Sequence, residues 1–403
     1  MTVLAINAGS SSIRFAFYDP GEPLVRRLGG KLERIGSKDA RLTVNTPGED
    51  PPRHLALEAP DFSSAVSALT GLLEREPIFA GVTAVGHRVV HGMRRTEPVA
   101  VTPALIEELA CIASLDPEHL PQEIELMRTL GAKYPRLAQV ACFDTAFHST
   151  MPRVATLLAI PRRYESKGVR RYGFHGLSYT YLVAELERLG DPTAARGRLV
   201  LAHLGSGASL AAVRDGRCID TSMGFTPAAG IPMGTRSGDV DPGLVGYLAR
   251  TEGMDAAAVD KMTNHESGLL GLSETSSDIR DLLARAGDDA RAADAVDVFC
   301  YQTKKWVAAF AGALGGLDTL VFAGGIGEHA PAVRARICAG LEFLGLGLAA
   351  AKNAVGAPII SSDASTVTVR VIATDEESVI AEITRNVLTG ARKPPALSTE
   401  TTP

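Results

Sequence analysis

The sequence is poor in the residues that build cross-linked or zinc-stapled proteins. Only five cysteines occur among 403 residues, and none of them stands in a C-x-x-C spacing. An odd number of scattered cysteines argues against a disulfide framework and against a cysteine zinc site. We therefore expect reduced, buried thiols at all of these positions: Cys111, Cys142, Cys218, Cys300 and Cys338.

Long hydrophobic runs are missing as well. No uncharged apolar stretch reaches the roughly 18 residues of a membrane-spanning helix. The first residues, MTVLAINAGSSS, lack the basic segment and the following apolar segment of a secretory signal. These absences predict a cytoplasmic protein with no membrane partner.

Neither sign of charge dominates the composition. Lys and Arg number 41, Asp and Glu number 46, and the formal net charge is −5. A broad basic surface for nucleic acid is therefore excluded, and any anion site must be built locally. The length suggests two or three domains, and 45% hydrophobic residues suffice for large cores.

The phosphate-binding pattern GxxxxGK[ST] is also absent, which excludes a P-loop nucleotidase. What the sequence does contain is an alternation of β-branched runs with alanine- and leucine-rich stretches, which predicts the α/β class. The clearest strand candidates are TVLAIN, TAVGHRVV, AQVACFD, RLVLAHL and TLVFAGG. The last segment, 391–403, has few apolar residues and is predicted to be disordered.

Two distant segments share one pattern. LAINAGSSSIRFAFYD at 4–19 and LAHLGSGASLAAVRD at 201–215 both suggest strand, small-residue turn, strand. Such turns serve hairpins sterically, but they also present backbone N–H groups and hydroxyls to a phosphate. As a pair half a chain apart, they suggest a duplicated domain that grips a nucleotide. A third glycine turn, at 324–328, follows the strand TLVFA and is expected to open a helix.

Charged side chains occur where strands are expected. In AVGHRVVHG, alternation places Arg88 and Val90 on one strand face. Arg88 needs an anion, which is either a structural ion-pair partner or a substrate carboxylate whose apolar end faces Val90. Asp144 follows the strand AQVACF, where an aspartate serves either the site or a helix cap.

Three loops carry further candidates. RYGFHGLSYTYL at 171–182 shows no secondary-structure pattern of its own. It holds His175 between glycines, close to Arg170 and Arg171, which suits an anion or an ordinary surface turn. MGTRSGDVDPG places Arg236 in a polar loop, which Asp239 and Asp241 are expected to hold. TDEES contains Glu376 and is either a helix-capping pattern or a metal-side carboxylate.

Together these segments resemble the acetate kinase family. NAGSSS, GHRVVHG, FDTAFH, RRYGFHG, HLGSGAS, GFTP, MGTRSGDVDP, AGGIGE and TDEE occur in the family's order, from Asn7 to about Glu382. The resemblance implies duplicated ribonuclease-H-like, actin-like ATPase domains flanking a nucleotide cleft. It places the first domain at 1–146 plus 375–390 and the nucleotide-binding domain at 147–374, and it implies a homodimer.

The implied activity is reversible, ATP-dependent phosphorylation of acetate to acetyl phosphate with Mg²⁺ or Mn²⁺. Two alternatives stay open: a propionate or butyrate kinase, and a non-catalytic ATP-binding module. By resemblance, Arg88 binds the acetate carboxylate, and Val90, Phe174 and Pro227 enclose its methyl group. The catalytic residues are Asp144, His175, Arg236 and His119, and the metal residues are Asn7 and Glu376. The nucleotide-contacting residues are Arg14, His203, Leu204, Gly205, Ser206, Gly207, Asp278, Ile279, Arg280, Gly324, Gly325, Ile326, Gly327 and Glu328.

Three positions depart from the family pattern. Arg14 stands where the family has lysine, which keeps the charge and changes the geometry. Ser206 replaces an asparagine. SLDPEHLP replaces the family's LHNP, so that His119 matches through H-x-P and Leu115 is displaced by an apparent insertion.

The chemistry follows from charge. A carboxylic acid with a pKa near ~4.3 is ionised at neutral pH, so acetate needs no general base. The difficulty is repulsion between two anions, which arginine, histidine and Mg²⁺ relieve in a loose in-line transition state. We therefore expect Asp144 to position partners rather than to transfer protons.

Overall fold

The computed structural model describes residues 1–9, 12–49, 51–190 and 196–391. The chain divides into two compact units. Unit 1 consists of Met1–Ala146 with the segment that begins at Asp375, and unit 2 is Phe147–Thr374. The tail predicted to be disordered lies, except for Ala391, outside the described residues.

Unit 1 is built on an eight-stranded mixed sheet in the order β5-β4-β3-β2-β1-β6-β8-β7. Strands β1 to β5 pair antiparallel with their neighbours, β6 and β8 continue parallel to β1, and β7 closes the edge antiparallel. Their bounds are β1 Thr2–Ala8, β2 Ser12–Asp19, β3 Val25–Glu33, β4 Arg41–Asn45, β5 Arg53–Ala56, β6 Val82–Val89, β7 Val99–Ala100 and β8 Ala138–Phe143.

Unit 2 repeats the centre of this sheet. Its strand order is β11-β10-β9-β12-β13, in which three antiparallel strands are followed by two parallel ones. The bounds are β9 Arg198–Leu204, β10 Ala208–Arg214, β11 Arg217–Thr221, β12 Thr319–Ala323 and β13 Thr368–Val371. The pairs β1–β2 and β9–β10 are the two predicted strand-turn-strand segments, so the internal repeat is confirmed.

Helices connect and cover these strands. Unit 1 contains α1 Phe62–Arg75, α2 Pro103–Cys111, α3 Leu120–Lys133 and α15 Glu376–Thr389. Unit 2 contains α4 Arg153–Thr156, α5 Gly176–Arg188, α7 Pro242–Thr251, α8 Ala256–His265, α9 Gly268–Ser273, α10 Ile279–Arg285, α11 Ala290–Leu314, α12 Gly324–His329, α13 Pro331–Cys338 and α14 Ala350–Ala354. The alternation of these helices with strands confirms the α/β class.

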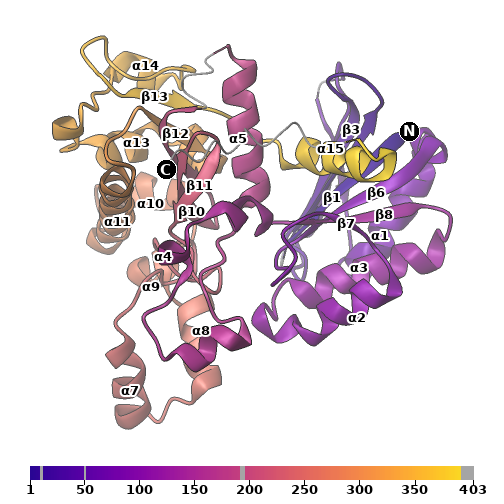
Figure 1. Ribbon diagram of the computed structural model, residues 1–403, viewed down its shortest axis with the longest axis horizontal. Coiled ribbons are helices and arrows are strands. Elements are labelled where there is room, and N and C mark those ends of the chain that lie inside the picture. The colour runs from indigo at the N-terminus through magenta and orange to yellow at the C-terminus, as the bar shows by residue number, and fades with distance from the viewer. Residues whose placement is uncertain (10–11, 50, 191–195, 392–403) are drawn as a thin grey trace, which may run out of the picture. The chain divides into compact units, whose positions relative to one another are not determined.

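The core of unit 1 explains why the C-terminal helix belongs to it. Phe15 and Phe17 alternate on β2 and pack with Leu69 of α1 in one apolar cluster. Helix α15 packs against β1, β6 and β8, and Figure 1 shows it, in yellow, beside these early strands. The approach requires Gly86 on β6, because a Cβ there would meet Ile380 and Thr384 of α15.

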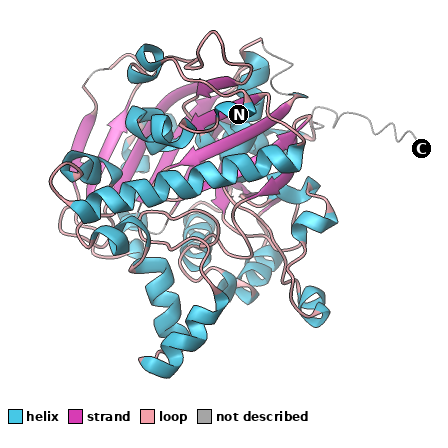
Figure 2. Ribbon diagram, turned by 90° about the vertical axis from the view of Figure 1, so that its left-hand side faces the viewer, coloured by secondary structure: helices cyan, strands magenta, loops and turns pink. Residues whose placement is uncertain are grey.

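In unit 2, helices lie on the sheet in the same way, as the cyan helices across magenta strands in Figure 2 illustrate. Helix α5 contributes Tyr179, Leu182 and Leu186 to an apolar cluster with β9, β10 and β12. These residues recur at three- and four-residue spacing, so one helix face is apolar. The expectation that RYGFHGLSYTYL at 171–182 lacks secondary structure is therefore wrong from Gly176 onward, where α5 begins.

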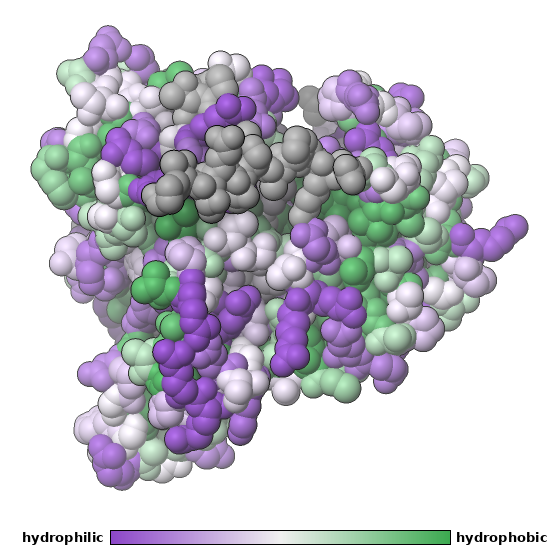
Figure 3. All heavy atoms as spheres, viewed as in Figure 1, coloured by the Kyte–Doolittle hydropathy of each residue, from purple (hydrophilic) through white to green (hydrophobic). Residues whose placement is uncertain are grey.

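Surface features complete the description. No helix among the described residues is long and apolar enough to cross a membrane. On the face drawn in Figure 3, hydrophilic and hydrophobic residues are interspersed. Four of the cysteines are buried, but Cys111 is exposed at the C-terminal end of α2, so the expectation of burial is wrong there.

Candidate active site

The predicted site residues fall on both units, and each group is described within its own unit. In unit 1, Arg88 lies near the carboxyl end of β6, and its side chain is 12% exposed. Its Nη2 and Nε donate to Asp144 Oδ2 at 2.9 and 3.2 Å, and its Nη1 donates to the carbonyl of Ala8 at 3.2 Å. Strands β6 and β8 are parallel neighbours, so their carboxyl ends lie side by side. Asp144, just after β8, therefore meets Arg88 at the carboxyl ends of these strands.

These contacts settle part of the alternatives for Arg88. The arginine has a structural anionic partner, Asp144, which takes two of its five N–H donors, and the carbonyl of Ala8 takes a third. Burial acts to lower the pKa of Arg88, but the charges of Asp144 and Glu123 raise it above its usual value. The guanidinium is therefore permanently charged and held in one orientation by Asp144.

A carboxyl group that sequence reasoning missed lies beside this arginine. Glu123, in the first turn of α3, accepts from the N–H of Val90 with both oxygens, at 2.9 and 3.2 Å. Its Oε1 is 3.9 Å from Arg88 Nη1, and the residue is 2% exposed. From the sequence, a glutamate at this position suggests only a favourable charge at a helix N-terminus. Nothing in the sequence indicated that Glu123 would lie beside Arg88.

His119 is buried immediately before α3. Its Nδ1 lies 2.8 Å from Asp116 Oδ1, and its backbone N–H donates to the same oxygen at 3.1 Å. Leu115 ends the short 3-10 helix Ala113–Leu115. The replaced motif thus forms an internal Asp116–His119 pair, and a catalytic role for His119 stays a prediction.

The two predicted metal residues are neighbours in unit 1. Asn7 Nδ2 donates to Glu376 Oε2 at 2.6 Å and to Glu377 Oε1 at 3.3 Å. Asp375 caps α15 by accepting from the N–H of Ser378 at 3.0 Å, so TDEES is both a helix cap and a carboxylate source. Arg14 is exposed on β2 directly opposite Asn7, and its charge acts to lower the pKa of Glu377, which burial raises.

The oxygen atoms of Asn7 and Glu376 fit Mg²⁺. This ion prefers hard oxygen donors, keeps several waters and is held by one or two carboxylates together with substrate phosphates. Within the described ranges, no three His, Cys, Asp or Glu side chains form a metal-binding group.

In unit 2, His175 precedes α5 in the left-handed conformation, with φ of 58°. Its Nδ1 lies 2.8 Å from Ser209 Oγ, which in turn lies 2.5 Å from the hydroxyl of Tyr179. Its ring stacks on His203 with centroids 4.4 Å apart. A non-glycine residue held in this conformation is strained, and such residues gather at functional sites.

The turn between β9 and β10 faces His175 and Arg236. A Cβ at Gly207 would lie 3.3 Å from His175 Nε2 and 3.8 Å from Arg236 Nη1. Arg236 Nη1 also donates to the carbonyl of Pro227 at 3.5 Å. Phe174 is buried beside His175, and its carbonyl is 2.8 Å from the Nε2 of His148. The structure therefore brings His175, Arg236, Pro227 and the Gly205–Gly207 turn together.

The other predicted nucleotide segments lie at helix starts in unit 2. Gly324 opens α12 with φ of 74°, and a Cβ there would come 2.7 Å from the carbonyl oxygen of Leu204. This close approach requires glycine. Asp278 caps α10 by accepting from the N–H of Arg280, whose exposed guanidinium pairs with the same carboxylate. Of the remaining members, Ser206 and Gly325 are exposed, whereas Ile279, Ile326 and Gly327 are buried.

Sequence reasoning also missed the side chain that braces the 324–328 segment. Arg334 on α13 is fully buried and donates from Nη1 to the carbonyls of Gly327 and Glu328 at 2.8 and 2.9 Å. A buried arginine with backbone partners carries no sequence signature, because its spacing resembles that of a surface residue.

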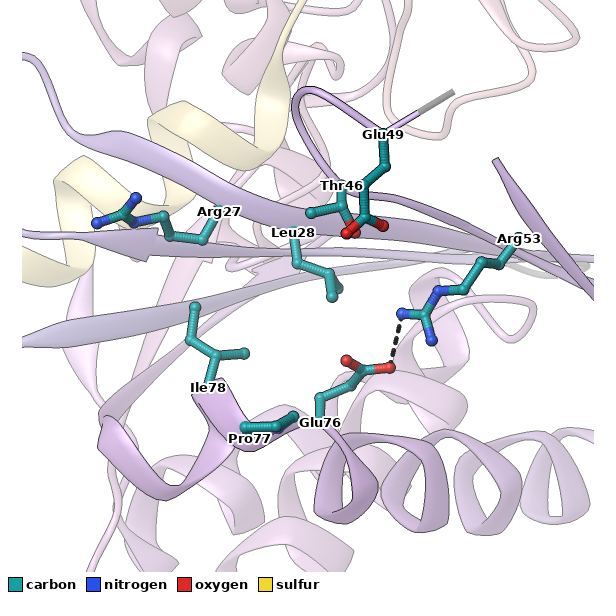
Figure 4. A pocket seen from close by; sticks show the side chains of 8 residues that line it. All are labelled: Arg27, Leu28, Thr46, Glu49, Arg53, Glu76, Pro77 and Ile78. Atoms are coloured by element: carbon teal, nitrogen blue, oxygen red, sulfur yellow. Dashed lines mark hydrogen bonds and ion pairs between the residues drawn. The ribbon is translucent and has the colours of Figure 1, made fainter. Parts of the chain in front are cut away.

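A separate hollow of about 480 Å³ lies in unit 1 and contains none of the predicted site residues (Figure 4). Glu76 and Arg53 on its wall are paired at 2.8 Å. Its lining residues are Arg27, Leu28, Thr46, Glu49, Arg53, Glu76, Pro77 and Ile78.

Comparisons with known proteins match nearly the whole chain. The model of the acetokinase family matches residues 2–382. A protein named acetate kinase from Rhodopseudomonas palustris (strain TIE-1) is 42% identical over 97% of this chain and 99% of its own length. One of the same name from Bacteroides fragilis (strain ATCC 25285) is 41% identical over 96% of this chain and 100% of its own length.

Solved structures agree. A propionate kinase from Francisella tularensis superposes with a TM-score of 0.88 at 35% identity, covering 96% of this chain and 99% of that one. An acetate kinase from Porphyromonas gingivalis gives a TM-score of 0.84 at 36% identity with the same coverage. The fold is thus the acetate and sugar kinase/actin-like one expected from the sequence. The chain belongs to the acetokinase family.

Proposed function

We propose that this protein catalyses reversible phosphoryl transfer from ATP to acetate, forming acetyl phosphate and ADP. The observation that carries the proposal is Arg88, a charged guanidinium held by Asp144 near the carboxyl end of β6, two positions before the buried, apolar Val90. Its recorded bonds leave two N–H donors, the number that a carboxylate takes in a bidentate contact. Asp144 is then a positioning residue for Arg88.

The transfer is a direct displacement. A carboxylate oxygen of acetate forms a bond to the γ-phosphorus as the bond to the β–γ bridging oxygen breaks, and ADP leaves with that electron pair. Arg236 and His175 supply charge and hydrogen bonds to the transferring group. When bound, Mg²⁺ or Mn²⁺ would neutralise phosphate charge, with Asn7 and Glu376 as its protein ligands.

The contacts of His175 support a donor role. A phenol is a stronger acid than an aliphatic hydroxyl, so Tyr179 is the donor in its short bond to Ser209. Ser209 then donates to His175 Nδ1, which places the remaining ring proton on Nε2. Nε2 is the atom beside the Gly207 turn, where it would donate to a phosphoryl oxygen.

We assign ATP to the glycine turns and helix starts of unit 2: 203–207, 278–280 and 324–328, with Arg14 as a further phosphate contact. The domains proposed are 1–146 plus 375–390 and 147–374, in a cytoplasmic protein.

A homodimer is the proposed assembly. Helix α7 has no buried residue and exposes Leu244, Val245 and Tyr247, which suits a surface between two copies. Sedimentation should give a dimer that Tyr247→Asp weakens. A wild-type monomer at micromolar concentration would remove this assignment.

Trapping of the acyl phosphate with hydroxylamine tests the function directly. Acetate-dependent hydroxamate and ADP should form, and Arg88→Ala should raise the KM for acetate at least tenfold, roughly the contribution of a charged hydrogen bond, with little change for ATP. Equal increases in the KM values of acetate and ATP would instead show that Arg88 serves only as a structural ion-pair partner. Acetate-independent ATP hydrolysis without hydroxamate would favour the non-catalytic ATP-binding module.

A propionate kinase is the second candidate, since one such protein has the same fold with a TM-score of 0.88. A series of acetate, propionate and butyrate, compared by kcat/KM, separates the two.

A further inference from the structure

Two carboxyl groups share one guanidinium in unit 1. Asp144 accepts from Arg88 through two donors, whereas Glu123 lies 3.9 Å from Nη1 and makes its hydrogen bonds to the N–H of Val90. Asp144 and Glu123 are 1% and 2% exposed, so water screens neither charge. One positive charge cannot compensate two buried negative ones, and the less tightly paired carboxyl group is the one that retains its proton.

The proton belongs on Glu123. The pKa of its carboxyl is raised to about 8, above all by burial and in smaller part by the negative charges of Asp116 and Asp144. Arg88 and the Val90 N–H act in the opposite direction and lower this pKa. At neutral pH the group is therefore mostly uncharged, and it ionises in mildly alkaline solution.

Among the described residues, Arg88, Asp116 and Asp144 are the charged groups that act most strongly on this carboxyl. Asp116 precedes the helix and is itself paired with His119. Helices α1 and α2 also contact α3, but the acidic side chains that they pair with it, Glu74 and Glu107, meet Lys133 and Arg128 at exposed positions. Arg88, Asp144 and the Asp116–His119 pair are thus the groups that set the charge at Glu123.

We propose that Glu123 controls how strongly Arg88 binds a carboxylate substrate: the protonated form leaves the arginine able to attract the anion, and the ionised form cancels that attraction. With Glu123 uncharged, the charges of Arg88 and Asp144 sum to zero, and an incoming carboxylate meets two remaining guanidinium donors. The charge of Glu376 also acts on Arg88, and it does so whether or not Glu123 is ionised. With Glu123 ionised, the buried group carries a net negative charge and repels the substrate. The inference rests on the proposed role of Arg88 in acetate binding.

The hydrogen bond between Glu123 and the N–H of Val90 links Arg88 to the apolar residue of the proposed carboxylate site. Glu123 holds the backbone of Val90, which directly follows the last residue of β6 and lies two positions after Arg88. Glu123 is therefore a positioning residue for both parts of the proposed carboxylate site.

Steady-state kinetics across pH test this. Acetate is ionised throughout the range, so the wild-type KM for acetate should rise about tenfold between pH 7 and pH 9, as one ionisation near pH 8 requires. The KM for ATP should stay flat. Glu123→Gln, which keeps the acceptor for Val90 and cannot ionise, should flatten the acetate profile. Glu125→Gln, on the same helix, is the control and should behave as wild type.

A wild-type acetate KM that stays constant to pH 9 overturns the inference without any variant, as does an equal rise in Glu123→Gln. Hydroxamate formation at pH 7 separates this result from the proposed function. If acetyl phosphate forms there and the profile is flat, only the role of Glu123 fails. If none forms with saturating acetate, the function itself fails.

Discussion

At the scale of single residues, the candidate site residues of each unit are charged or polar groups held by fixed partners. Arg88 and Arg236 each have backbone or carboxylate partners that hold the guanidinium in place, and His175 is fixed through Ser209. Preorganised donors of this kind stabilise a transition state without reorganising during the reaction.

Arg236 and His175 should therefore act on kcat. Arg236→Ala is expected to lower kcat by about 10² or more, with little change in the KM for ATP, because one charged donor to the transition state is lost. His175→Ala should lose less, since a neutral imidazole donates one hydrogen bond where a guanidinium brings a fork and a charge. Steady-state rates with saturating substrates measure both. A retained kcat removes Arg236 from the catalytic set, and a larger loss at His175 reverses the order.

At the scale of elements, helix α5 places His175 and Tyr179 one turn apart, so that both reach Ser209 on β10. Strand β6 ends at Val89, so Val90 lies just beyond it, and the expectation that Arg88 and Val90 alternate on one strand face does not hold. The helical period thus turns a spacing of four residues into a shared face.

Tyr179→Phe tests the helix. Without the hydroxyl of Tyr179, the hydroxyl of Ser209 is no longer held in one orientation toward His175. The kcat should therefore fall by roughly tenfold, the effect of losing about one hydrogen bond, while the KM for ATP changes little. The melting temperature should stay at the wild-type value. A purely structural effect would instead lower thermal stability and change kcat and the KM for ATP together.

Val90→Ala tests whether the residue that follows β6 contacts the alkyl group of the substrate. Each methylene accommodated by an apolar wall is worth about 0.8 kcal/mol, so opening this wall should raise the propionate-to-acetate ratio of kcat/KM several-fold. ATP saturation is the control and should not move. If the ratio does not change, Val90 does not contact the alkyl group of the substrate. The segment around His119 is then the next candidate for this contact.

At the scale of the whole molecule, each unit encloses its own buried titratable groups, and these couple folding to pH. His87 on β6 is 2% exposed, and its Nε2 lies 2.7 Å from Gln139 Oε1 on β8. Burial lowers the pKa of His87 to about 4, despite the opposing effect of the bond to Gln139.

Stability should consequently fall in acid. Between about pH 6.5 and pH 4, the unfolded chain binds a proton that the folded chain does not, so the free energy of unfolding decreases as the pH falls through this window. His87→Gln should remove part of that slope. Thermal unfolding at several pH values measures it, and identical slopes in variant and wild type would show that His87 does not titrate as expected.

Much of the fold was predictable because its signals are local. The strand-turn-strand repeat depends on alternation and on small residues, and both copies form as expected. The start of α5 was missed because His175, a non-glycine residue in a left-handed conformation, precedes it without a standard capping side chain.

For this protein, sequence alone determined the α/β class, the duplicated hairpins, the family and the identities of the candidate residues, because periodicity and motif order are properties of neighbouring positions. Tertiary structure decided which charges meet. Glu123 and Arg88 are 35 positions apart, and Asn7 and Glu376 lie near opposite ends of the chain. Their pairings arise from sheet order and from the packing of α3 and α15, and burial then sets their protonation, which no spacing along the chain encodes.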